Sequence, residues 1–146
     1  MQQELYQAAA QTFEALAFLS PVPPEEADAR QGQLDQAVCV AFRGPFCGRL
    51  ELRTCAGLMP ALAENMMGED APPTLDQQRD ALGEVANVIC GNVLPAIAGS
   101  REVFHLDAPR FVTACEPETP PAASVRMCLD AGCAEVLLFT DLSVAA

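Results

Sequence analysis

Residues 75–97 constrain the fold of this chain most, because they form its longest run of helical hydrophobic periodicity. At about 100° per residue, the apolar side chains predict one core-facing stripe: Leu82, Val85, Ala86, Ile89, Val93 and Ala96. Pro95 removes a backbone hydrogen bond and is expected to bend or end the helix. Gly83 and Gly91 each cost about 1 kcal/mol relative to alanine. These glycines therefore indicate either close packing against a sheet or close approach by another backbone or a partner.

The remaining segments predict an α+β fold, in which helices pack on one face of an antiparallel sheet. Further helical patterns cover residues 4–19 and 58–67. Short β-type runs predict two hairpins and one more strand: 37–42 with 46–52, 124–129 with 135–142, and 110–115. With 146 residues, 51% of them hydrophobic, the chain is expected to form one domain, spanning residues 1–146.

The net charge excludes several classes of partner. Twenty acidic residues against eight basic ones give −12, and no basic stripe offsets this, so nucleic acid and anionic membranes are unsuitable partners. The first residues lack the features of a secretory signal, and no apolar run approaches the ~18 residues that span a bilayer. A cytoplasmic location is expected.

The cysteines are expected to be free thiols. Their number is odd and no C-x-x-C pair occurs: Cys39, Cys47, Cys55, Cys90, Cys115, Cys128 and Cys133. The one histidine, His105, completes no ligand set with zinc-site spacing. We therefore expect neither a disulfide nor a metal site on this chain.

The polar side of the long helix carries the candidate site. Asp80, Glu84 and Asn87 stand at positions i, i+4 and i+7, which places two carboxylates and an amide within about 60° of arc. Gly91 extends this face without a side chain. Polar residues opposite an apolar stripe are also typical of any surface helix. Periodicity alone does not separate a solvated face from a site.

The stretch 80–92, D-A-L-G-E-V-A-N-V-I-C-G-N, resembles the signature of the CheC/CheX chemotaxis phosphatases, in which an acidic residue precedes E-x-x-N on one long helix. The following Gly91 and Asn92 are typical of the CheX-type branch. The family pattern also places a proline a similar distance beyond the asparagine. Here Pro109 follows Asn87 with 21 residues in between, slightly fewer than in the pattern.

CheC-type members carry a second E-x-x-N helix, whereas Glu64 and Asn65 are adjacent here and do not share a helix face. The resemblance therefore implies one active site on a CheX/CheC-like fold, which is also similar to the middle domain of the flagellar switch protein FliM.

The resemblance implies a phosphatase that hydrolyses the aspartyl phosphate of a CheY-like response-regulator receiver domain. Asn87 would orient the attacking water, and Glu84 would pair with the lysine of the receiver. Asp80 and Gly91 would serve docking, although Asp80 also suits the start of a helix through the macrodipole. Mg²⁺ would come from the receiver, so no cofactor is expected on this chain.

Alternative functions stay open at this point. The same face could belong to a non-catalytic receiver-binding or flagellar-switch adaptor, or to an interaction domain of a pathway other than motility. The oligomeric state is also open, a homodimer included. Under the phosphatase hypothesis two acidic surfaces meet, because the receiver pocket is lined by carboxylates. Bound Mg²⁺ and a basic patch on the partner would have to offset the repulsion.

Overall fold

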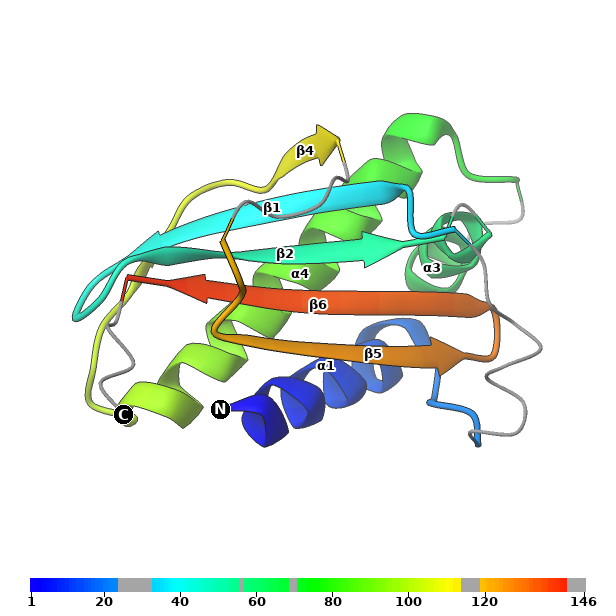
Figure 1. The fold of residues 1–146 in the computed structure, drawn as a ribbon. Coiled ribbons are helices and arrows are strands. Elements are labelled where there is room, and N and C mark those ends of the chain that lie inside the picture. Colours follow the sequence, from blue (N-terminus) through cyan, green and yellow to red (C-terminus); the bar gives the residue numbers. More distant parts are fainter. Residues whose placement is uncertain (24–32, 56, 69–70, 114–118, 142–146) are drawn as a thin grey trace.

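The computed structural model describes residues 1–23, 33–55, 57–68, 71–113 and 119–141. Its helices, α1 (Gln2–Ala17), α3 (Leu58–Met67) and α4 (Leu75–Ala98), lie together on one face of an antiparallel sheet (Figure 1). The strands are β1 (Gln36–Arg43), β2 (Gly48–Thr54), β3 (His105–Leu106), β4 (Arg110–Thr113), β5 (Ala123–Leu129) and β6 (Gly132–Thr140). The predicted α+β class and its one-sided helix layer are confirmed.

Both predicted hairpins form and lie side by side in the sheet. The strand order is β3-β1-β2-β6-β5, and every described pairing is antiparallel. The free edge of β1 pairs with β3 at one end, through Phe42 and Leu106, and with β4 at the other, through Val38 and Phe111. Residues 107–109 therefore run along the edge of β1, between β3 and β4.

The core lies between the sheet and the helix layer, and α4 contributes much of it. Of the predicted stripe, all residues but one are buried: Leu82, Val85, Ala86, Ile89 and Val93. Ala96 is exposed, contrary to prediction, because Ile97 and Ala98 are the residues of the last turn of α4 that pack against the core. Pro95 does not end the helix, which continues to Ala98. The amide of Gly99 then donates to the Pro95 carbonyl (2.8 Å).

Among the described residues, α4 is also the helix that is long and apolar enough to cross a membrane, over Leu75–Ala98. The expectation that no apolar run approaches the length of a membrane span is therefore wrong for this helix. Half of its apolar window is buried inside the protein, and the helix contacts α1, α3 and β1. These contacts make α4 a core helix of the domain.

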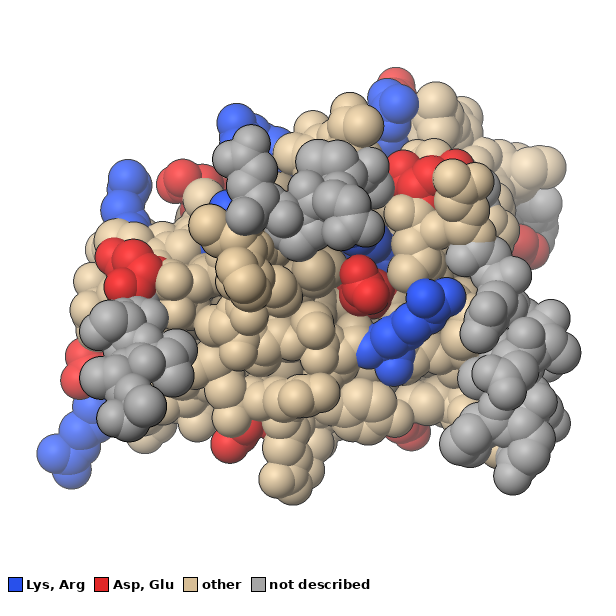
Figure 2. Space-filling model, in the orientation of Figure 1, with Lys and Arg blue, Asp and Glu red and all other residues tan. Residues whose placement is uncertain are grey.

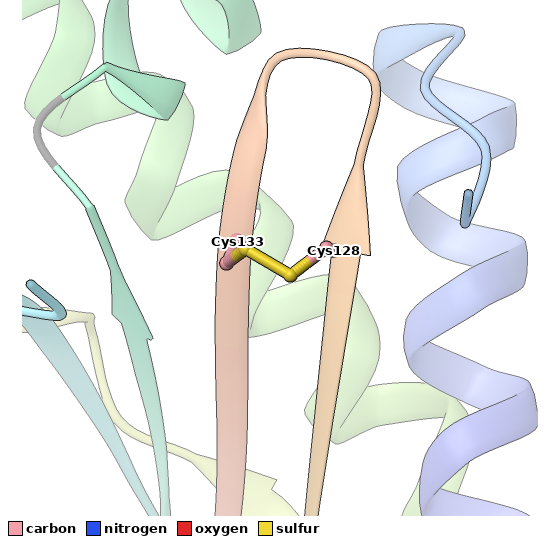
Figure 3. Close-up of a disulfide and its surroundings, with 2 residues drawn as sticks. All are labelled: Cys128 and Cys133. Carbon is pink, nitrogen blue, oxygen red and sulfur yellow. A yellow bond between two sulfur atoms is a disulfide. The ribbon is translucent and has the colours of Figure 1, made fainter. Parts of the chain in front are cut away.

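A disulfide joins Cys128 and Cys133 across the β5–β6 hairpin (Figure 3). The prediction of seven free thiols is therefore wrong. Cys128 and Cys133 face each other in the strand register, one pair away from the turn, and their Cα atoms are 3.9 Å apart. The remaining described cysteines are free: Cys39, Cys47, Cys55 and Cys90. Cys115 lies outside the described residues.

The disulfide lies on the sheet face away from the helices. Its strand neighbours Met127 and Leu129 belong to the core on the other face, and side chains alternate between faces along a strand. On this outer face, acidic and basic side chains are interspersed among uncharged ones (Figure 2). Glu51 and Arg53 form a largely buried ion pair there, at 2.6 Å. The outer face is therefore separated from α4 by the whole sheet.

Candidate active site

A capping box fixes the start of α4. The side chain of Thr74 accepts a hydrogen bond from the Gln77 amide (3.1 Å), and the Gln77 side chain accepts one from the Thr74 amide (2.9 Å). These reciprocal bonds satisfy two amides that a helix start leaves without partners. Asp76 lies in the first turn, where the macrodipole favours an acidic side chain. The first residue of α4 is thereby fixed at Leu75.

The N-terminal half of α4 borders a pocket of about 650 Å³. The described residues that line it come from α4, β4 and the connection before β4: Asp76, Arg79, Asp80, Gly83, Glu84, Pro109 and Phe111. Asp80 and Glu84 are exposed, as their positions on the helix predict. The structure therefore brings the two predicted carboxylates to one concave surface.

Gly83 is buried where this pocket meets the chain that connects β3 to β4. A β-carbon at residue 83 would lie 3.2 Å from Cβ and 3.4 Å from Cγ of Pro109. The absence of a side chain thus lets Pro109 sit directly on the helix. Close packing, one of the two explanations considered for the glycines, holds at this position.

Asn87 lies one helical turn beyond Glu84 and is half-buried. It is not among the residues lining the 650 Å³ pocket, so the predicted pair stands at the border of the pocket and not wholly inside it. Within the described parts of the chain, neither Glu84 nor Asn87 takes part in a side-chain hydrogen bond or ion pair. Both side chains are free to contact a partner molecule.

Gly91 continues the same face one turn further on. No atom lies within 4 Å of a β-carbon built at this position, and the residue is exposed. A smaller pocket of about 210 Å³ adjoins it, with apolar walls from Leu94, Pro95 and Phe104 among others. A side chain at position 91 would therefore contact nothing in the described chain, whereas a side chain at position 83 would contact Pro109.

Sequence reasoning missed three residues that line this pocket, Asp76, Arg79 and Phe111. The Arg79 guanidinium lies over the Phe111 ring, 5.5 Å from its centroid, within range of a cation–π interaction. Helical spacing alone could have placed Arg79 near Asp76 and Asp80. Nothing local could have placed Phe111 there, because its position depends on β4 pairing with β1.

Cys90, on the buried side of α4, offers no nucleophile to the site. Burial raises the pKa of its thiol to about 12, and the nearby Cys39 adds to this effect. A thiol with this pKa stays protonated near neutral pH and is a poor nucleophile. Among the described residues, no group of three or more His, Cys, Asp or Glu side chains could hold a metal ion. The chemical groups that α4 offers to the site are therefore the carboxylates of Asp76, Asp80 and Glu84, the guanidinium of Arg79 and the amide of Asn87.

The sheet and its helix layer are those of a CheC/CheX-type domain. Within this class, the chain belongs to the CheX family. The family model described as chemotaxis phosphatase CheX matches residues 36–131, more than half of the chain. The matched region contains all of α4 and the Pro109 contact. A comparison with curated protein sequences gives no significant match.

Solved structures share the fold at low sequence identity. The chemotaxis protein CheX from Desulfovibrio desulfuricans is 19% identical, with a TM-score of 0.72 over 92% of this chain and 94% of the other. CheX from Vibrio vulnificus is 18% identical, with a TM-score of 0.71 over 95% of each chain. A chain of the CheX–CheY–BeF₃–Mg²⁺ complex from Borrelia burgdorferi is 15% identical, with a TM-score of 0.60 over 94% of this chain and 96% of that one.

Proposed function

We propose that this protein accelerates hydrolysis of the aspartyl phosphate of a CheY-like receiver domain. The observation that carries the proposal is the pair Glu84 and Asn87, one turn apart on α4 and without side-chain partners in the described structure. Membership of a phosphatase family supports it. So does the complex of a related CheX protein with CheY, BeF₃ and Mg²⁺. The receiver is the proposed substrate in its phosphorylated form.

An aspartyl phosphate needs little chemical assistance to hydrolyse. It is an activated acyl phosphate with a carboxylate leaving group, so catalysis rests on placing water in line and stabilising charge on the phosphoryl oxygens. The Mg²⁺ of the receiver supplies the second effect in this proposal. What this chain contributes is an oriented water molecule.

Asn87 suits that task because its carbonyl oxygen can accept a hydrogen from water while its NH₂ group donates to another acceptor. Its half-buried position limits the rotamers that the amide can adopt, which favours a fixed orientation. The exposed Glu84, one turn earlier, would reach a cationic group of the partner and set how deeply α4 inserts. Asp80 and Gly91 extend the docking face on either side of this pair.

The test is the decay of a phosphorylated receiver with and without this protein. Purified CheY-type receivers from the same organism are phosphorylated with a small-molecule donor, and released phosphate is followed over time. We expect at least a tenfold acceleration for one receiver, equivalent to about 1.4 kcal/mol of barrier lowering. Binding of a beryllofluoride-treated receiver without any acceleration would overturn the proposal and favour the adaptor function instead.

A further inference from the structure

The candidate site is mainly acidic, which is a difficulty for binding a receiver. Asp76, Asp80 and Glu84 line the same pocket, on a chain with a net charge of −12. A partner that holds an aspartyl phosphate with Mg²⁺ must itself present carboxylates, since Mg²⁺ is bound through carboxylate and phosphate oxygens. Two such surfaces repel each other on approach. A productive interface therefore needs a positive group on the side of this chain or of its partner.

Arg79 supplies a positive group at the required place. It is exposed, and it is the basic residue among the described residues that line the pocket. In the described structure it forms no ion pair with Asp76, three residues before it, or with the adjacent Asp80. Its guanidinium instead rests against the ring of Phe111, on β4. The charge is therefore not neutralised within the described chain, and its position is restricted by an aromatic contact.

Given the proposed function, we propose that Arg79 strengthens binding of the receiver by contacting a carboxylate on the rim of the receiver's phosphorylation pocket. Arginine suits this contact because its planar guanidinium donates two parallel hydrogen bonds to a carboxylate. Phe111 holds the side chain in place, so less conformational entropy is lost on binding. Arg79 lies about 12 Å before Asn87 along the helix axis, which assigns it to binding and not to the hydrolytic step.

A purely structural role makes a different set of predictions. If Arg79 only attached β4 to α4 through Phe111, its loss would lower the unfolding temperature and weaken binding equally at all salt concentrations. If it binds a carboxylate across the interface, its loss would weaken binding most at low ionic strength, where charges are screened least. Salt dependence therefore separates the two roles.

The experiment measures Kd for a CheY-type receiver saturated with beryllofluoride and Mg²⁺, at 25, 100 and 400 mM NaCl. The variants are Arg79→Gln, Arg79→Lys and Phe111→Leu. Arg101→Gln is the matched control, because it removes the same charge from an exposed position beyond the far end of α4. We expect Arg79→Gln to raise Kd about tenfold at 25 mM and less than threefold at 400 mM. The Kd values of Arg79→Lys and Phe111→Leu should lie between those of Arg79→Gln and the wild type.

Because Arg79 is assigned to binding, Arg79→Gln should lose a larger factor in affinity for the receiver than in the dephosphorylation rate measured at a saturating concentration of the variant. The inference is overturned if Arg79→Gln binds like the wild type at 25 mM, if its deficit is independent of salt, or if Arg101→Gln shows the same deficit. A wild-type protein that binds the receiver without hastening phosphate loss would overturn only the proposed function, because the Kd comparison could still be made. A wild type that does not bind any receiver overturns both.

Discussion

Gly83 of α4 and Pro109 of the β3–β4 connection are packed so closely that a β-carbon on residue 83 would lie 3.2 Å from the proline ring. This contact joins the helix that carries the candidate site to the edge of the sheet. It also holds Phe111, two residues later, beside Arg79. Gly83 therefore has a supporting role in the site, whereas Gly91 on the same helix has an open environment.

Alanine should affect stability differently at the two glycines. Gly91→Ala should raise the free energy of unfolding by up to about 1 kcal/mol, because alanine is the better helix former and meets no neighbour. Gly83→Ala should gain less or lose stability, because Pro109 must move. Urea denaturation measures both. If Gly91 is a point of close approach, Gly91→Ala should also weaken receiver binding while stabilising the fold, and unchanged binding would remove it from the docking face.

Asn87→Ala should leave the fold and receiver binding nearly intact and remove most of the acceleration, since the amide acts mainly in the transition state. Asn87→Asp keeps the shape but loses the NH₂ donor and places negative charge beside the phosphoryl oxygens. It should be at least as inactive as Asn87→Ala in a phosphate-release time course. Full activity in Asn87→Asp would contradict the proposed orientation of water.

Glu84→Gln should behave differently, because Glu84 is assigned to a charged contact with the partner. The substitution keeps size and helix propensity but removes the charge. We expect weaker binding of the beryllofluoride-treated receiver, by roughly 1.5–3 kcal/mol for a hydrogen bond to a charged group, together with a slower reaction. The thermal unfolding temperature serves as the control and should match the wild type, since Glu84 is exposed. A slower reaction at unchanged affinity would contradict the assignment.

Removing the Cys128–Cys133 bond should lower stability without affecting activity. The chain-entropy estimate for so short a loop is roughly 2 kcal/mol, and the bond lies across the sheet from α4. The double variant Cys128→Ala/Cys133→Ala should therefore unfold at lower urea and retain the wild-type dephosphorylation rate. Mass spectrometry after alkylation, with and without reductant, reports whether the bond is present in the cell. Cytosolic thiol systems normally keep such pairs reduced.

Alkaline pH should destabilise the protein through Cys90. Its folded-state pKa of about 12 lies above the reference value of 9.0, so the unfolded chain loses this proton first as pH rises. Stability is then fully retained below about pH 9 and falls toward pH 12, by up to about 1.4 kcal/mol per pH unit. Burial also raises the pKa of Cys39, which acts in the same direction. Cys90→Ala should flatten the pH dependence of the unfolding free energy between pH 8 and 10.5, and an unchanged slope would exclude this cause.

Periodicity was sufficient for α4, for the buried stripe as far as Val93 and for both hairpins, because these features depend on residues close in sequence. It failed at Ala96, since Ile97 and Ala98 are the residues of the last turn that pack against the core. It failed again at Cys128 and Cys133, because their bond depends on the register of two strands around a short turn. The odd number of cysteines favoured free thiols and so argued against this pair.

The candidate site shows the same limit. Asp80, Glu84, Asn87 and Gly91 could be placed on one helix face from their spacing alone. The contact of Arg79 with Phe111 could not, since it requires β4 to pair with the edge of β1. The reason for a glycine at position 83 is also a long-range contact, since Pro109 packs directly against it. The pairing of β4 with β1 thus brings Phe111 to the pocket. Helical spacing cannot predict this side of the pocket.

The placement of the proposed pair on a single helix has an evolutionary consequence. If the proposed function holds, the reacting pair Glu84 and Asn87 requires one turn of a helix whose buried side still packs. Positions outside this helix face and the lining of its pocket can then exchange residues, provided that volume and polarity are kept. Structures with the same fold at 15–19% identity are what such loose constraint would produce. Descent in this family would then be traced more reliably through a short stretch of α4 than through whole-chain similarity.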